Sequence, residues 1–160
     1  MMSKGKGLFF VVFLGFLLAA TSAFAGSLSI PDTSGEKGAT VEIPVNIDNA
    51  AGVAGFQMTV NYDPSVLDCA KAAAGDLTGG WSVTAKTEKG KVNIGGFSPV
   101  LSGLSGSGSL AKLACTVIGE SEKKTEVKIS SKKLADSNGS EITSSVRGAG
   151  IFKVKKGKGK

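Results

Sequence analysis

Cys69 and Cys115 are the two cysteines of this 160-residue chain, and they are the side chains whose chemistry is easiest to foresee. In an oxidising compartment they would form a disulfide, which closes a loop of about 45 residues and stabilises the fold by about 4 kcal/mol in the chain-entropy view. In a reducing compartment they would remain two buried thiols. Both lie at apolar positions of alternating segments. We expect the disulfide, provided that the protein is exported.

Catalytic and metal-binding chemistry has little support in the remaining residues. The chain contains no histidine, which excludes Ser-His-Asp and Cys-His pairs and the zinc and haem sites that require histidine. Its thirteen acidic residues are scattered, and no glycine-rich segment has the lysine of a phosphate-binding loop. Asp136 to Gly139 resembles the start of a calcium loop, but Arg147 stands where the EF-hand motif needs glutamate. We therefore predict no catalytic site, no cofactor and no metal site, and a turn at residues 136–139.

The first 25 residues have the layout of a secretory signal peptide. Lys4 and Lys6 form a basic start, Leu8 to Ala20 is almost entirely apolar, and Ala23-Phe24-Ala25 is a small-x-small cleavage motif. The apolar run is shorter than the ~20 residues of a membrane span, and no second run follows. The sequence predicts cleavage before Gly26 and a secreted or periplasmic protein without a membrane span. A retained membrane anchor is the alternative.

Lysines concentrate at the other end, where residues 154–160 form a low-complexity basic tail. Between Gly26 and Phe152, eleven lysines and one arginine face thirteen acidic residues, a net charge of −1, although the whole chain carries +6. Because the body has no basic stripe with interleaved aromatic residues, we do not expect nucleic-acid binding. The tail is predicted to be disordered and solvated. Contact with anionic polymer or lipid headgroups at the cell surface is the alternative.

Short segments with a period of two dominate residues 26–153 and predict an all-β fold. Their number, about nine, and the length of this region predict a single two-sheet β-sandwich domain. Residues 81–87 and 91–97 are expected to form a hairpin around a glycine turn. Pro44 suggests an edge position or a β-bulge. Residues 70–75 are the one candidate for a helical turn.

The strand that begins at Gly55 shows this alternation most clearly. One of its faces is expected to be buried and the other exposed, because successive side chains of a strand point to opposite sides. The inward residues are Phe56, Met58, Val60 and Tyr62, and the outward residues are Gln57, Thr59 and Asn61. Asp63-Pro64 then ends the strand, since proline has no N–H for a sheet ladder. A second short strand with Leu67 and Cys69 follows at once.

Four segments resemble the cohesin domain, the exported β-sandwich module that holds dockerin-bearing enzymes on cellulosome scaffolds. They are Gly38–Val45, Gly55–Leu67 with its Tyr62-Asp63-Pro64, Gly108–Val117, and Leu134–Ile142 followed by Gly148–Phe152. The likeness covers residues 26–153. It implies a jelly-roll sandwich without catalytic activity, whose partner is a dockerin-type module of another exported protein. Any calcium is then expected on the dockerin partner.

The resemblance also implies which residues meet the partner. In cohesins the partner binds one sheet face, which corresponds here to residues 55–61, 91–97, 109–116 and 130–135. The outward residues expected on that face are Gln57, Thr59, Asn61, Lys91, Asn93, Leu110, Lys112, Ser131 and Lys133. Leu110 is the expected apolar anchor, since interface hot spots are usually apolar or aromatic.

Other interaction classes stay open. Cellulose-binding modules with a related sandwich share parts of the pattern, so a carbohydrate-binding module for polysaccharide or cell-wall polymer is the main alternative. It would need exposed aromatic side chains, and Trp81 is the one candidate platform, although a place in the core or at its rim is the simpler expectation. A surface assembly protein that pairs through strand edges is a third class. The chain has one domain and no Pro/Thr-rich linkers, which favours an exported partner outside a cellulosome.

Overall fold

The structure, a computed structural model, describes residues 24–158, which form eleven β-strands and no helix. The predicted signal peptide spans residues 1–25, and its residues 1–23 lie outside the described residues. Phe24 and Ala25 begin the first strand. The all-β prediction is confirmed. The strands are β1 (Phe24–Ser29), β2 (Thr33–Glu36), β3 (Thr40–Ile47), β4 (Gly55–Asn61), β5 (Leu67–Ala74), β6 (Ser82–Glu88), β7 (Lys91–Phe97), β8 (Gly108–Val117), β9 (Lys124–Ala135), β10 (Glu141–Val146) and β11 (Gly150–Lys155).

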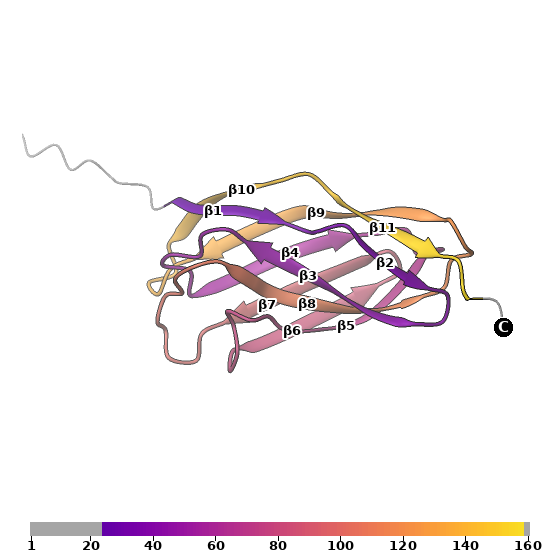
Figure 1. The fold of residues 1–160 in the computed structure, drawn as a ribbon. Helices are drawn as coiled ribbons and strands as arrows, with labels where there is room; N and C mark the ends of the chain where they lie inside the picture. Colours follow the sequence, from indigo (N-terminus) through magenta and orange to yellow (C-terminus); the bar gives the residue numbers. More distant parts are fainter. Residues whose placement is uncertain (1–23, 159–160) are drawn as a thin grey trace, which may run out of the picture.

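Two layers of strands face each other across one hydrophobic core (Figure 1). One layer contains β5, β8 and β3, and the other contains β6, β7, β4 and β9. The parallel pair β1–β10 joins the layers, and β11 lies between β2 and β9. The described chain begins at one end of the sandwich and finishes at the other (Figure 1). The predicted two-sheet sandwich is therefore confirmed.

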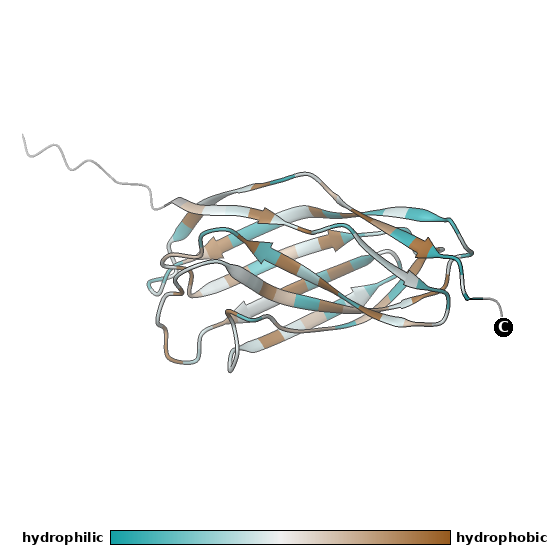
Figure 2. Cartoon of the chain, viewed as in Figure 1, coloured by the Kyte–Doolittle hydropathy of each residue, from teal (hydrophilic) through white to brown (hydrophobic). Residues whose placement is uncertain are grey.

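The core is built mainly by alternation of apolar and polar residues along the strands (Figure 2). Phe56, Met58 and Val60 of β4 are buried, whereas the residues between them are exposed or half-buried. They belong to one cluster with Ile43 of β3 and Phe152 of β11. Burying a side chain of this size contributes about 1.5–3 kcal/mol. A slip of one residue would turn the whole inward set of β4 towards solvent, so this burial also fixes the register.

Two expectations about element boundaries are wrong. Residues 70–75 form no helical turn, because β5 continues to Ala74 and stays paired with β8 after a bulge between Cys69 and Lys71. The final strand β11 extends to Lys155, beyond the boundary at residue 153 predicted for the domain. Val154 is fully buried, so it belongs to the core and not to the basic tail.

The irregularity expected at Pro44 is present. The register of β3 against β8 shifts between Val45 and Asn46, directly after the proline. On its other side, β3 pairs with β1 at Asn46 and Ile47 alone. Proline is thus placed where one edge of its strand makes no ladder, which is where a sheet tolerates a residue without an N–H.

A disulfide joins β5 to β8 and confirms the predicted bond. Cys69 and Cys115 are opposite each other in the antiparallel pair, with their Cα atoms 3.9 Å apart. The turn that precedes β5 supports this placement, because the Asp63 carboxylate accepts hydrogen bonds from the N–H and the hydroxyl of Ser65 (2.8 and 2.7 Å). The Tyr62 hydroxyl also accepts the Cys69 N–H at 3.3 Å. The Tyr-Asp-Pro stop and the disulfide therefore form one connected unit.

Candidate partner-binding face

Four neighbouring strands, β6, β7, β4 and β9, expose one side of their sheet; we call this surface the β4 face. The face is four strands wide: β7 pairs with β6 and β4, and β4 pairs in turn with β9. The register aligns its outward side chains in cross-strand rows. These rows are Thr84–Gly95–Gln57–Lys133, Lys86–Asn93–Thr59–Ser131 and Glu88–Lys91–Asn61–Lys128.

The middle of the β4 face is hollowed. A depression of about 730 Å³ lies over all four strands and is lined by Gln57, Gly95 and Lys133 among others. A second depression of about 400 Å³ shares these three residues and reaches Phe97. The hollow exists because β7 carries Gly95 at an outward position, between Thr84 of β6 and Gln57 of β4. A sheet face with missing side chains at its centre can receive a convex partner.

Two successive glycines of β7, Gly95 and Gly96, have different roles because they point to opposite sides of the sheet. A Cβ on Gly95 would meet nothing closer than the Phe56 carbonyl oxygen at 3.8 Å, so the outward position has room. A Cβ on Gly96 would lie 2.6 Å from Cε1 of the Phe56 ring, which is too close for any side chain. Gly96 therefore makes space for the core, and Gly95 makes space on the surface.

Polar contacts fix the floor of the hollow. The Thr59 hydroxyl donates a hydrogen bond of 2.8 Å to Oδ1 of Asn93, across β4 and β7. At the end of the face, Lys91 pairs with Glu88 at 3.2 Å in the turn between β6 and β7. These contacts are neutral or exposed, and they create no activated acid, base or nucleophile. The chemistry available here is hydrogen bonding and charge pairing with another surface.

Seven of the nine residues predicted for partner binding lie together on the β4 face. Three strands contribute them, and the register makes them direct neighbours. They are Gln57, Thr59, Asn61, Lys91, Asn93, Ser131 and Lys133.

Leu110 and Lys112 do not belong to this face, and their prediction was wrong. Both lie on β8, which pairs with β3 and β5 in the opposite layer. The register shift in β8 leaves Leu110 as an extra residue between the partners of Val45 and Asn46. A bulge allows two successive residues to point inward. Leu110 is accordingly fully buried and cannot be an exposed anchor.

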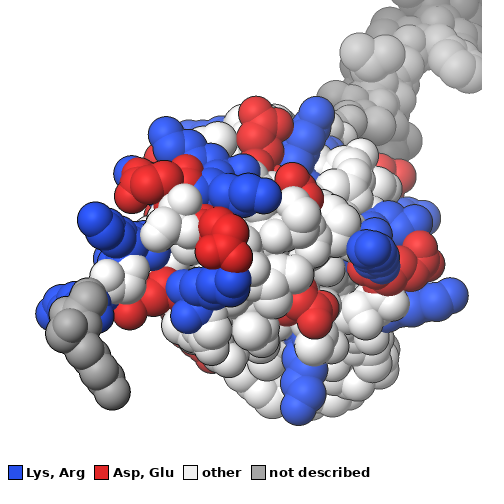
Figure 3. Space-filling model, turned by 90° about the vertical axis from the view of Figure 1, so that its right-hand side faces the viewer, with Lys and Arg blue, Asp and Glu red and all other residues white. Residues whose placement is uncertain are grey.

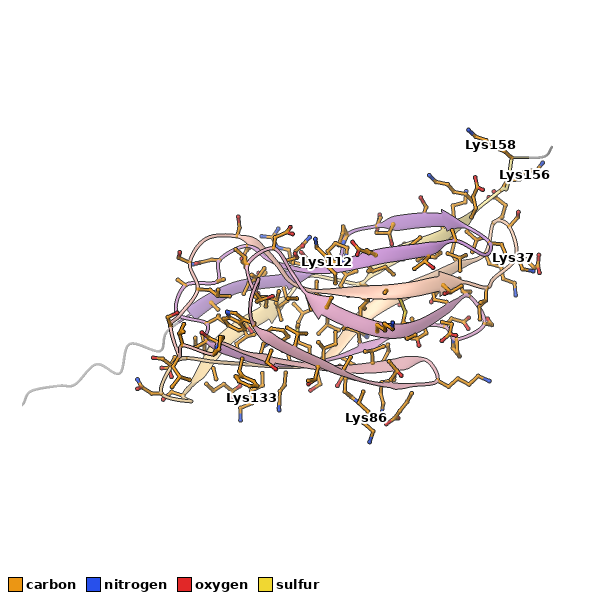
Figure 4. All side chains as sticks on the ribbon, turned by 90° about the horizontal axis from the view of Figure 1, so that it is seen from below. Lys37, Lys86, Lys112, Lys133, Lys156 and Lys158 are labelled. Atoms are coloured by element: carbon orange, nitrogen blue, oxygen red, sulfur yellow. A yellow bond between two sulfur atoms is a disulfide. The ribbon has the colours of Figure 1, made fainter. Side chains whose placement is uncertain are left out.

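Lys112 lies on the outward side of β5, β8 and β3, which we call the β8 face. Its Nζ pairs with the Asp76 carboxylate at 2.8 Å. This contact raises the pKa of Lys112 and lowers the pKa of Asp76, because the hydrogen bond and the opposite charge favour both ionised forms. Figure 4 shows Lys112 on the other side of the sandwich from Lys86 and Lys133.

The sequence-based prediction did not include three residues of the β4 face, Lys86, Thr84 and Lys128. The hairpin pattern could have identified the first two. Lys86 lies opposite Asn93, and Thr84 lies opposite Gly95. Both follow from the predicted hairpin around Gly90, since the partner of each residue can be counted outward from the turn. The place of Lys128 on this face depends on the bulge in β9 between Ile129 and Ser131, and no short-range sequence pattern predicts that bulge.

The aromatic residues do not form an exposed strip. Trp81 is half-buried and stacks on Phe56, with ring centroids 6.2 Å apart. It is therefore a residue at the rim of the core, as the simpler expectation had it. Among the side chains that the structure describes, Phe97 is the exposed aromatic one, with 57% of its surface accessible.

Other sites named from the sequence are structural. Asp136 Oδ1 accepts the N–H groups of Asn138 and Ser140 at 2.8 and 2.9 Å, which makes residues 136–139 the predicted turn. Within residues 24–158, no cluster of three or more His, Cys, Asp or Glu is arranged to hold a metal ion. The same residues contain no helix that is long and apolar enough to cross a bilayer.

Comparison with known proteins identifies the family. The sequence model of the Cohesin domain matches residues 26–154. The chain belongs to the cohesin domain family. Among curated proteins, a stretch of 60 residues is 30% identical to Cellulose-binding protein A of Clostridium cellulovorans, over 38% of this chain and 3% of the length of that protein. The chain thus corresponds to a small part of that relative.

Solved cohesins share the fold. A non-cellulosomal cohesin from the archaeon Archaeoglobus fulgidus superimposes with a TM-score of 0.70 at 21% identity, over 82% of this chain and 91% of that one. The sixth cohesin of scaffoldin B from Acetivibrio cellulolyticus, solved in complex with a Cel5 dockerin mutant, gives 0.71 at 23% identity, over 83% and 100%. CaCohA2 of Clostridium acetobutylicum, in complex with a variant of CaDoc0917, gives 0.70 at 26%, over 81% and 99%. These likenesses place the sandwich described above among cohesin folds.

Proposed function

We propose that this protein is a non-catalytic cohesin module that binds a dockerin-type module of another exported protein through the β4 face. The observation that carries the proposal is the hollow on that face, whose lining includes five of the residues expected to meet a partner: Gln57, Thr59, Asn93, Ser131 and Lys133. Support also comes from similar cohesins that were solved with dockerins bound. The setting would be polysaccharide degradation or assembly at the cell surface.

The face has the physical properties of a docking surface for a preformed module. Its backbone is fixed by pairing on both sides of β7 and β4, so little order is lost when a partner binds. Its side chains at the centre are short and polar, and its apolar edge is provided by Phe97. Such an arrangement provides hydrogen bonds in the middle and an aromatic contact at one end.

A steric block of the hollow tests this proposal. Gly95→Leu would place a bulky side chain at the centre of the β4 face, where the glycine has room for a Cβ. We expect binding of a purified dockerin-type module, measured by isothermal titration calorimetry, to weaken by at least tenfold while thermal unfolding is little changed. Ala114→Leu is the matched control, since Ala114 is an outward residue of the β8 face. Equal binding by both variants would refute the assignment of the face.

The carbohydrate alternative has less support. A sugar platform needs an aromatic face open to solvent, and Trp81 is half-buried against Phe56. Affinity electrophoresis on cellulose, chitin and peptidoglycan distinguishes the two functions. Retardation that Trp81→Ala abolishes would favour the carbohydrate module.

We also propose that the protein acts outside the cytoplasm, in the periplasm or as a secreted protein that associates with the cell surface. The disulfide between β5 and β8 supports this, because such bonds persist in oxidising compartments. The signal-peptide pattern of residues 1–25 agrees with it. Fractionation of the host, followed by mass measurement of the mature N-terminus, tests both points.

A further inference from the structure

Lysines are concentrated on the β4 face, although the body of the protein is nearly neutral. Residues 26–152 have a net charge of −1, yet the three rows of the face contain four lysines and one glutamate. Lys91 is paired with Glu88. Lys86, Lys128 and Lys133 make no ion pair with any described residue. Glu141 of β10 is the acidic residue in the lining of the hollow, and it forms no ion pair with these lysines. The face therefore offers a partner three lysines that are free of ion pairs.

This concentration is particular to one side of the sandwich. On the β8 face, outward Lys71 is accompanied by Asp68 and Glu42, and Lys112 is paired with Asp76. At the end of the molecule near the C-terminus, basic and acidic side chains are intermingled (Figure 3). Lys37 pairs there with Glu120, and Lys153 pairs with Glu122 at 2.8 Å.

The lysines flank the hollow and do not fill it. Lys86 is on β6, at one side of the face, whereas Lys128 and Lys133 are on β9, at the other side. Figure 4 shows Lys86 and Lys133 projecting from the same side. Three strand spacings of about 4.8 Å separate β6 from β9 by roughly 14 Å. An α-helix is about 10–12 Å wide with its side chains, so one helix fits lengthwise between Lys86 on one side and Lys128 and Lys133 on the other.

We infer that the β4 face selects a partner whose docking helix is acidic, with carboxylates along both flanks and small or apolar residues against Gly95. This inference rests on the proposed dockerin-binding function and specifies the chemistry of the partner. A neutral or basic helix in the same place would remove water from three lysines without replacing it by opposite charge, which is costly. An acidic helix would pair them and would also be steered towards the face before contact.

The test uses one dockerin-type scaffold in two versions. The exposed flanks of its docking helix carry glutamates in the first version and lysines at the same positions in the second. We expect the glutamate version to bind the purified protein about tenfold more tightly or better, mainly through a faster association rate that falls as salt is raised. Biolayer interferometry at low and high ionic strength measures both rates.

Charge reversal on the protein provides the matched variants. Lys86→Glu combined with Lys133→Glu should abolish or invert the preference for the glutamate version. Lys71→Glu combined with Lys156→Glu makes the same change in net charge away from the β4 face, and it should leave the preference intact. Thermal unfolding of both double variants verifies that the fold is retained.

The outcomes separate this inference from the function on which it rests. If both scaffold versions bind equally, and the face variants change nothing, dockerin binding stands and the charge selection is refuted. If neither version binds the wild-type protein or the reversed variant, the proposed function itself fails. An unstructured polyglutamate peptide that binds as tightly as the acidic helix would show a general polyanion site, which also overturns the inference.

Discussion

The two faces of this sandwich follow the same alternation of inward and outward residues, but they differ in the contacts that their outward side chains make. The β8 face covers the layer that contains the disulfide, and its Lys112 is already paired with Asp76. The β4 face has a hollow at Gly95, and Lys86, Lys128 and Lys133 at its sides form no ion pair with any described residue. The comparison indicates that cross-linking and charge pairing hold one layer together, while the other presents unsatisfied groups on a rigid sheet.

Removing the disulfide, which lies in the layer beneath the β8 face, should give the largest effect. We expect Cys69→Ala combined with Cys115→Ala to lower the free energy of unfolding by about 4 kcal/mol, because the unfolded chain gains the freedom of the opened loop. Denaturant unfolding measures this loss, and the reduced wild-type protein is the control. Below the unfolding transition, dockerin binding through the β4 face should persist. A stability loss under about 1 kcal/mol would contradict the role given to the bond.

The neighbouring glycines of β7 test the division between core and surface within a single strand. Gly96→Ala should destabilise the protein by about 1–3 kcal/mol, since its methyl group would overlap the Phe56 ring. Gly95→Ala should change stability by less than about 0.5 kcal/mol, because its methyl group points into the hollow. Thermal and denaturant unfolding of the two variants give the comparison. Equal effects would mean that the faces are not separated as described.

The hydrogen bond between Thr59 and Asn93 tests whether the floor of the β4 face is held rigidly. Thr59→Val removes the hydroxyl that donates to Asn93 and should cost about 1 kcal/mol of stability. Thr116→Val is the matched change on the exposed side of β8 and should be nearly neutral. The two unfolding free energies are measured by the same denaturant titration. A larger loss in Thr116→Val would reverse the expected order.

The smallest effect is expected from the ion pair of the β8 face. Lys112 lowers the pKa of Asp76 below its ordinary value of 3.8 by donating a hydrogen bond to the carboxylate and by its charge. Because the folded-state pKa is depressed, the pair stabilises the fold above pH 3.8, and this contribution is lost as the pH falls through the lowered pKa. Lys112→Gln should therefore raise the pKa of Asp76 towards 3.8. Carboxyl NMR titration measures this shift, and an unchanged pKa would exclude the pairing in solution.

Local patterns were sufficient for most of the fold. The alternation in β4 predicts its buried and exposed sides, because a strand has a period of two whatever surrounds it. The pairing of Cys69 with Cys115 was also foreseeable, since export and apolar positions favour a bond between the only two cysteines. The hairpin around Gly90 brings Lys86 opposite Asn93 by counting alone.

The position of β8 could not be predicted in this way. The resemblance to cohesins assigned residues 109–116 to the partner face beside β4, but the strand lies in the other layer. Leu110 was expected to face solvent by parity, and the bulge in β8 turns it inward. Neither the choice of layer nor the position of a bulge is encoded in the period of a single strand, because both depend on which distant segment supplies the hydrogen bonds.

The sequence by itself determined an all-β sandwich with a disulfide, because the alternation along each strand and the apolar positions of the two cysteines are local facts. Only the tertiary structure decided which outward residues share one surface. Strand order brought β6, β7, β4 and β9 together, so that Gly95 lies at the centre of a hollow with Lys86 and Lys133 on its flanks. A binding face depends on neighbours across the sheet, and those neighbours are residues far apart in the chain.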